Sequence, residues 1–145
     1  MKQIVIDANV VAKWFIEEED STKARLLRDK FIEKEIKLIT PSLLYFDVLN
    51  TLKYSKLFSQ EELNNAGESL ENYGFIVITI KKKIREQIVK IAVEHDLSIY
   101  DASYIGLSIA METILCTADE KIIKKLPQRL RKYVISLNEV EEILD

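Results

Sequence analysis

Short apolar runs alternate along the chain with longer stretches in which apolar residues recur every three or four positions. The first pattern is typical of strands buried in a sheet, and the second is typical of helices that cover one. The predicted strands are QIVI (3–6), KLIT (37–40), FIVITI (75–80), TILCT (113–117) and YVISL (133–137). The predicted helices begin at about Asn9 and, further along, cover 21–34, about 41–55, about 60–72, 82–95, 98–112, about 119–126 and 138–144.

Polar residues mark the starts of three of these helices. Thr40 before Pro41 is a typical N-cap followed by a first-turn proline, so it predicts the start of the third helix. Ser59 with Glu62, and Ser98 with Asp101, have the spacing of a capping box.

Strands that alternate with helices predict an α/β protein. Its central sheet should be mostly parallel, with about five short strands, and covered by helices on both faces. The 145 residues have no internal repeat and no linker rich in Pro, Gly or Ser, so we expect one domain over residues 1–145. In such sheets a ligand binds outside the carboxyl ends of the strands, where the strand order reverses.

Composition excludes several classes of function. The net charge of −3 argues against a protein held to nucleic acid by bulk charge, although bound metal ions can supply local positive charge to a nuclease. There is no glycine-rich nucleotide fingerprint. The single cysteine, Cys116, excludes an internal disulfide and fits a reducing cytoplasm. No apolar run approaches the roughly 20 residues of a membrane span, and we expect no membrane segment and no signal peptide.

Four aspartates lie in apolar surroundings, unlike most other acids of the chain. Asp7 directly follows the first strand, and Asp119 lies two residues past TILCT. Asp101 falls in the first turn of an apolar helix, and Asp47 is predicted in mid-helix.

Three of these acids have simple structural explanations. Asp7 fits a helix N-cap, Asp101 fits the acid of a capping box, and Asp119 fits the favourable dipole of a first turn. Taken singly, each of these explanations is favoured. Asp47 is predicted several residues past any cap, so its charge needs a partner or a metal. Converging carboxylates also repel one another unless a proton or a cation joins them, and hard divalent ions prefer oxygen ligands.

Four segments resemble, in order, the acidic motifs of PIN domains, and most of all those of VapC toxins from VapBC toxin–antitoxin pairs. The segments are IVIDANVVAKWF (4–15), PSLLYFDVLNTL (41–52), LSIYDASYIGLS (97–108) and LCTADEKI (115–122). The second segment departs from the family pattern, because Asp47 stands where the family generally has glutamate.

The resemblance implies a three-layer α/β/α sandwich that works as a metal-dependent endoribonuclease with one or two Mg²⁺ or Mn²⁺ ions. Asp7, Asp101 and Asp119 would then be catalytic metal ligands, and Asp47 a fourth catalytic acid. Asn9 and Thr117 correspond to small polar residues that support the pocket, with Asn50 a weaker candidate, and the lysines expected to contact RNA are Lys121, Lys124 and Lys125. Cytoplasmic location, a homodimer and a VapB-like antitoxin are implied as well.

Other functions stay open at this stage. A phosphatase of the haloacid dehalogenase type also starts with a strand that ends in an acid, but it needs a second acid where this chain has Asn9. A PIN-like module that only binds a partner would explain the departure at Asp47. A PIN nuclease of RNA processing, outside toxin–antitoxin systems, has the same acids. A nucleophile activated by histidine is disfavoured, because His95 is the only histidine and falls near a predicted helix C-terminus, where it fits a structural or surface role.

Overall fold

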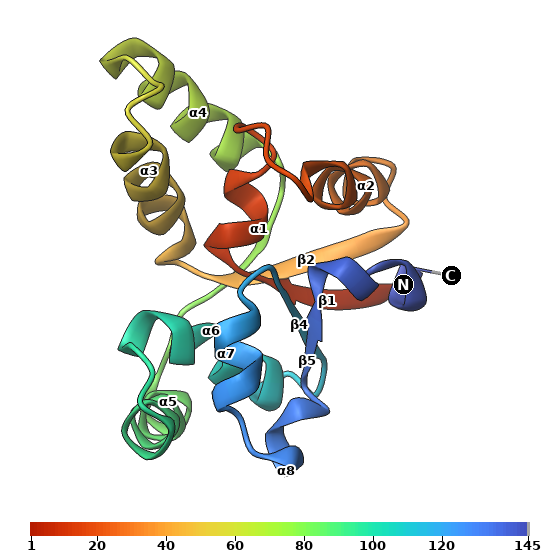
Figure 1. Cartoon of the computed structure of the whole chain (residues 1–145), viewed down its shortest axis with the longest axis vertical. Helices are drawn as coiled ribbons and strands as arrows, with labels where there is room; N and C mark the ends of the chain where they lie inside the picture. Colours follow the sequence, from red (N-terminus) through yellow and green to blue (C-terminus); the bar gives the residue numbers. More distant parts are fainter. Residues whose placement is uncertain (145) are drawn as a thin grey trace.

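A computed structural model describes residues 1–144 and contains a five-stranded sheet at its centre (Figure 1). All four strand pairs are parallel, and the order across the sheet is β3-β2-β1-β4-β5. The strands are β1 (Lys2–Ile6), β2 (Ile36–Pro41), β3 (Ile76–Ile78), β4 (Ile114–Thr117) and β5 (Val134–Ser136). The predicted sheet of five strands is therefore confirmed.

Helices cover both faces of the sheet, as the three-layer prediction requires. In Figure 1, α1 and α2 lie above the sheet, whereas α6 lies below it and packs against β1, β2 and β4. Helix α5 packs on α6, and α3 and α4 stand together at the upper left. The helices are α1 (Ala8–Ala12), α2 (Ser21–Ile32), α3 (Leu44–Tyr54), α4 (Gln60–Asn72), α5 (Lys82–His95), α6 (Ile99–Ala110), α7 (Glu120–Lys125), α8 (Gln128–Arg131) and α9 (Glu141–Leu144), with a 3₁₀ turn η1 (Leu137–Glu139).

The strand order reverses beside β1. The chain moves outward from β1 to β2 and β3, then returns to add β4 on the other side of β1. The carboxyl ends of β1 and β4 therefore form the switch point at which ligands bind in such sheets. Ile6 pairs with Cys116, so the residues that follow, Asp7 and Thr117, face each other at that edge.

The predicted cap at Thr40 is wrong. Strand β2 continues through Pro41, which pairs with Ile78, and Thr40 is buried within the strand. Helix α3 begins only at Leu44 and has no side-chain cap. Asp47 consequently lies in the first turn of α3, where the helix dipole favours a carboxylate, and not in mid-helix as predicted.

Two other predictions need correction at the sheet edge and near the C-terminus. The FIVITI run forms a strand of three residues at the edge of the sheet, and Val77 is exposed, so β3 is shorter and less buried than predicted. Helix α8 was not predicted. The capping box of Ser59 and Glu62 is confirmed, with both of its hydrogen bonds present.

The core lies on both sides of β1, whose residues Ile4, Val5 and Ile6 are fully buried. Helices α5 and α6 approach closely at Gly106, where an added Cβ would lie 2.5 Å from Cγ1 of Ile88. This contact fixes α6, and with it Asp101, against the rest of the lower layer in Figure 1. Within residues 1–144, no helix combines the length and the apolar character that crossing a membrane requires.

Candidate active site

Asp7 is the most buried of the four aspartates, with 3% of its surface exposed. It is the N-cap of α1, and its Oδ1 accepts a hydrogen bond of 3.1 Å from the backbone N–H of Val10. The pKa of Asp7 is raised to about 7, mainly because burial penalises the charged form; hydrogen bonds from Thr117 and Val10 oppose this shift, and the charges of Asp101 and Asp47 add to it. A carboxyl group with this pKa holds a proton in about half of the molecules at neutral pH, unless a cation replaces the proton.

Thr117 joins two of the predicted acids at the end of β4. Its hydroxyl donates to Oδ2 of Asp7 at 2.5 Å, and its Oγ1 accepts a bond of 3.1 Å from the backbone N–H of Asp119. Thr117 is fully buried, so these contacts hold the ends of β1 and β4 together. Asp119 is the N-cap of α7, and its Oδ1 accepts from the N–H of Lys121 at 2.9 Å.

Asp101 reaches the same place from α6. The hydroxyl oxygen of Ser98 accepts from the backbone N–H of Asp101 at 3.0 Å, but within the described residues the Ser98 N–H does not donate to the Asp101 carboxylate in return. The predicted capping box is therefore only half present. Burial raises the pKa of Asp101, and the charges of Asp119 and Asp47 contribute to the shift, while Ser98 and Lys125 oppose it.

Asp47 reaches the pocket from the start of α3. Its Oδ2 accepts a hydrogen bond of 2.9 Å from the hydroxyl of Tyr104, a residue of α6 that is 2% exposed. Burial raises the pKa of Asp47, and this hydrogen bond opposes the shift. The sequence pattern did not single out Tyr104, which lies in the apolar helix that carries Asp101. A tyrosine three residues after Asp101 is the signal that would have found it, because a buried phenol needs a polar partner.

The four predicted acids thus form one electrostatic cluster built from four separate segments of the chain. Asp7 interacts with Asp101 and Asp47, and Asp101 interacts with Asp119. Carboxylate oxygens in a partly buried cluster are suitable donors for a hard divalent cation. No group of three or more Asp, Glu, His or Cys residues within 1–144 is compact enough to form a ready metal cage. The donor chemistry fits Mg²⁺ nonetheless, because this ion keeps several waters and is usually bound by one or two carboxylates.

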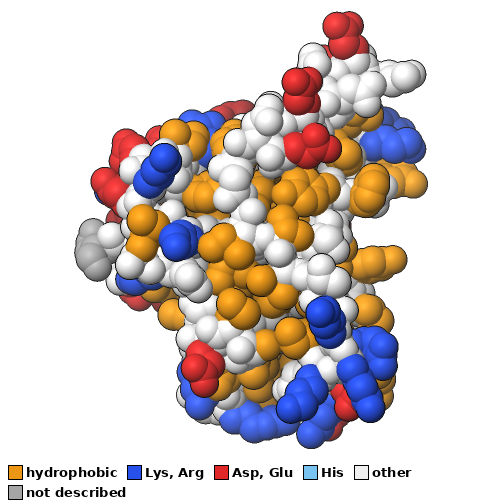
Figure 2. Space-filling view, turned by 180° about the vertical axis from the view of Figure 1, so that it is seen from behind, with side chains coloured by type: hydrophobic (Ala, Val, Ile, Leu, Met, Phe, Trp, Pro, Cys, Tyr) orange, Lys and Arg blue, Asp and Glu red, His pale blue; other side chains and the backbone are white. Residues whose placement is uncertain are grey.

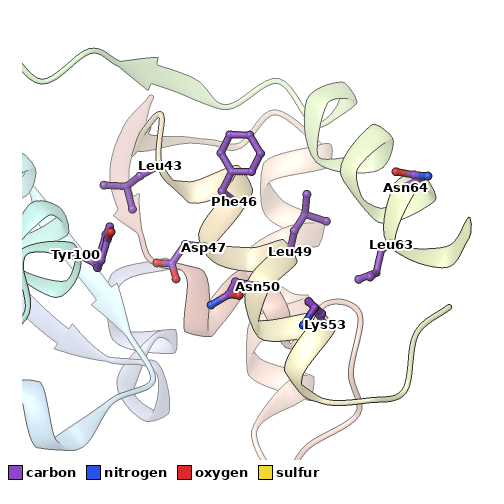
Figure 3. Close-up of a pocket in the computed structure, with 9 residues that line it drawn as sticks. All are labelled: Leu43, Phe46, Asp47, Leu49, Asn50, Lys53, Leu63, Asn64 and Tyr100. Atoms are coloured by element: carbon purple, nitrogen blue, oxygen red, sulfur yellow. The ribbon is translucent and has the colours of Figure 1, made fainter. Parts of the chain in front are cut away.

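A cavity of about 710 Å³ opens beside Asp47, between α3, α4 and the start of α6. Figure 3 shows the Asp47 side chain directed from α3 toward the side on which Tyr100 lies. Asn50 lines the same cavity and is exposed, one turn along α3 from Asp47. Two exposed aromatic residues, Phe46 and Tyr100, also line it.

Of the predicted lysines and Asn9, only some lie near the acids in the described part of the chain. Lys125 is the lysine that the structure brings to the acids: its Nζ donates to the carbonyl of Asp96 at 2.8 Å, and its charge lowers the pKa of Asp101. Lys121 and Lys124 are exposed on α7. Asn9 is exposed in the first turn of α1, and in the described part of the chain its side chain makes no recorded hydrogen bond to the acids.

The surface carries two other features near these elements. Figure 2 shows Lys and Arg side chains gathered at the lower right, on the side where α5 lies. The same view shows hydrophobic side chains across the middle and toward the upper right, the side of α3. Residues on and after α3 account for several large exposed hydrophobic side chains: Phe46, Tyr54 and Leu57.

Comparison with known proteins gives a family and a curated relative. Residues 4–127 match the PIN domain family. Ribonuclease VapC3 of Pyrobaculum aerophilum is 26% identical over 129 residues, which cover 86% of this chain and 95% of that protein.

Two solved structures are similar in fold. The protein PAE2754 of Pyrobaculum aerophilum aligns with a TM-score of 0.69 and 20% identity, covering 99% of this chain and 95% of that one. A toxin–antitoxin complex from Klebsiella pneumoniae contains a chain that aligns with a TM-score of 0.67 and 16% identity, covering 92% of this chain and 97% of that one.

Proposed function

Because this chain belongs to the PIN domain family, we propose that it is a metal-dependent endoribonuclease and the toxin of a type II toxin–antitoxin pair. The observation that carries the proposal is the cluster of Asp7, Asp47, Asp101 and Asp119 at the switch point of the sheet. The similarity to Ribonuclease VapC3 over most of both chains supports RNA as the substrate. We further propose that residues 1–145 act as one nuclease domain in the cytoplasm.

Hydrolysis of a phosphodiester needs an activated water and relief of the negative charge that gathers on the phosphate. One or two Mg²⁺ or Mn²⁺ ions, when bound, would supply both. Asp7, Asp101 and Asp119 would hold the ions, with Asp47 at the edge of the cluster. Thr117 keeps Asp7 and the backbone of Asp119 in a fixed relation through its two hydrogen bonds.

The proposal also assigns a place to the substrate backbone. Lys125 is anchored on the carbonyl of Asp96 and lies close enough to Asp101 to lower its pKa. A cation held there would attract the phosphate next to the one that is cleaved. Lys121 and Lys124 lie on the same short helix and would extend this contact along the RNA.

The partner that we propose is a VapB-like antitoxin, with the toxin itself a homodimer. The cavity beside Asp47 has an apolar lining of Leu43, Leu49 and Leu63. Such a groove suits the apolar face of a helix, and a basic side chain of that helix could reach Asp47. The fold similarity to a chain of a toxin–antitoxin complex is in keeping with this proposal.

The test is cleavage of a mixed RNA pool by purified protein with Mg²⁺, with Mn²⁺ and with EDTA. We expect cleavage that needs metal and is lost in Asp7→Asn and Asp101→Asn. Asp29→Asn is the matched control, because Asp29 is exposed on α2 and pairs with Arg28. Cleavage that persists in EDTA, or in both pocket variants, would refute the proposal.

A growth experiment separates a toxin from a nuclease of RNA processing. Induced expression of the wild type should stop the growth of a bacterial host, and expression of Asp101→Asn should not. Metal-dependent cleavage in vitro without any growth arrest would retain the nuclease and reject the toxin assignment.

A further inference from the structure

Tyr104 is an uncharged residue of the pocket on α6 that contacts an acid of another helix, α3. Its phenol is buried between α6 and the start of α3, and its hydroxyl donates to Oδ2 of Asp47 at 2.9 Å. Among the residues that the structure describes, it is the only recorded side-chain donor to the Asp47 carboxylate. Asp7 also acts on the phenol electrostatically, so Tyr104 lies within the field of two of the acids.

We propose that Tyr104 is a positioning residue of the metal site, which holds Asp47 by one oxygen so that the other remains available to the pocket. The proposal rests on the proposed function, because it assigns Tyr104 a task in metal binding. Tyr104 is not expected to touch substrate or metal itself.

The length of the acid explains why such a device is needed. Asp47 is one methylene shorter than the glutamate typical of its position, so a small rotation of its side chain changes what the carboxylate can reach. Asp47 is half-buried in the first turn of α3, a setting in which a carboxylate without a donor is costly. A hydrogen bond from a rigid, buried phenol removes that cost and restricts the carboxylate to one orientation.

The opposing explanation is that Tyr104 merely fills the interface of α3 and α6, with Asp47 satisfying its hydroxyl. The two explanations differ in what the hydroxyl does for metal binding. If Tyr104 only fills space, then phenylalanine, which has the same ring, should bind metal as the wild type does.

The experiment measures the dissociation constant of Mn²⁺ by calorimetry, with no RNA present, for the folded full chain. If Asp47 is a further metal ligand at the edge of the cluster, Tyr104 makes the outer hydrogen bond to that ligand. Loss of such a bond typically weakens metal binding by about 10–100-fold, and we expect Tyr104→Phe to fall in that range. The matched control is Tyr73→Phe, since Tyr73 packs edge-on against Trp14 in an aromatic cluster. At saturating Mn²⁺, Tyr104→Phe should recover the wild-type cleavage rate, because only metal occupancy is impaired.

A double-mutant cycle tests whether Tyr104 acts through Asp47. In an Asp47→Ala background, Tyr104→Phe should leave the dissociation constant unchanged, because there is no carboxylate left to position. An equal loss in both backgrounds would overturn the proposal and assign Tyr104 to packing. Wild-type affinity in Tyr104→Phe would overturn it as well.

A measurement on the wild type keeps the proposal testable if Tyr104→Phe does not fold. The ¹³Cζ resonance of Tyr104 should shift on titration with Mg²⁺, while that of Tyr73 should not. No shift at saturation would refute the proposal. Failure of the proposed function would look different: the wild type would bind Mn²⁺ no better than Asp101→Asn does.

Discussion

The burial of Asp7 makes a prediction about stability in the absence of metal. Asp7→Asn removes the charge but keeps a side chain that caps a helix as well as aspartate does, so the start of α1 is preserved. In the metal-free protein we expect the variant to be more stable than the wild type at and above neutral pH. This is opposite to the usual effect of a substitution at a buried polar site.

The magnitude follows from the pKa of Asp7, which rises from 3.8 to about 7 on folding. Below the lower value, both the folded and the unfolded chain hold the proton, and Asp7 contributes nothing to the pH dependence. As pH rises between the two values, the unfolded chain loses the proton first and is favoured, so wild-type stability falls. The full difference is about 4 kcal/mol, at 1.36 kcal/mol for each pKa unit, and it is reached above about pH 7.

The assay is urea unfolding of both proteins in EDTA, from about pH 4 to about pH 8. The free energy of unfolding of Asp7→Asn minus that of the wild type should rise with pH and level off above neutral. The altered hydrogen bond with Thr117 in the variant adds a constant to this free-energy difference at every pH, so the change of the difference with pH is unaffected. Asp29→Asn, at an exposed site, is the matched control. A flat difference for Asp7→Asn would refute the assignment of a raised pKa to this residue.

The same proton should compete with metal. A cation that binds the Asp7 carboxylate must first displace its proton, so the apparent affinity for Mn²⁺ should weaken about tenfold for each unit of pH below about 7. Isothermal calorimetry at several pH values measures this slope.

Three further predictions concern the scaffold and can be checked by urea unfolding. Gly106→Ala should lower the free energy of unfolding by roughly 1–3 kcal/mol, because the added Cβ would press on Ile88. The control Gly67→Ala, where the added Cβ meets only ordinary contacts, should be neutral or stabilising. Equal effects of the two substitutions would contradict the close approach of α5 and α6. Ser59→Ala should cost about 1 kcal/mol by removing the cap of α4. Lys34→Gly should raise the free energy of unfolding by up to about 1 kcal/mol, because Lys34 follows α2 with a φ of 63°, a left-handed conformation that glycine adopts without strain.

Lys34 also shows why the predicted ends of two helices were too late. Helix α2 was predicted to end at residue 34 and α6 at 112, two residues beyond their observed ends. Two residues past each helix lies a residue in the left-handed conformation, Lys34 after α2 and Glu112 after α6, at a position where glycine is the usual signal. Since neither residue marks a helix end in a sequence, the pattern could not locate these two ends.

The start of α3 was missed for a different reason. Thr-Pro is a sound local signal for a helix start, but Pro41 completes β2 by pairing with β3, a contact that depends on residues far along the chain. Pairing across the sheet overrode the local preference. This shift of the helix start changes the setting of Asp47. In the first turn of α3 its charge is stabilised by the helix dipole, so it depends less on a partner than a charge in mid-helix would.

The capping explanations and the pocket explanation of the acids turn out to be compatible. Asp7 caps α1 with Oδ1 and meets Thr117 with Oδ2, and Asp119 caps α7 with its Oδ1. Oδ2 of Asp47 accepts a hydrogen bond from the hydroxyl of Tyr104. In Asp119 and Asp47, one carboxylate oxygen is hydrogen-bonded and so orients the side chain. Within residues 1–144, the other oxygen of each has no hydrogen bond from the protein. A cap is therefore a means of orienting a carboxylate as well as of starting a helix. For this reason the residue types alone could not choose between the explanations, whereas the strand order, which brings Asp7 and Asp119 to one edge of the sheet, favours a shared site.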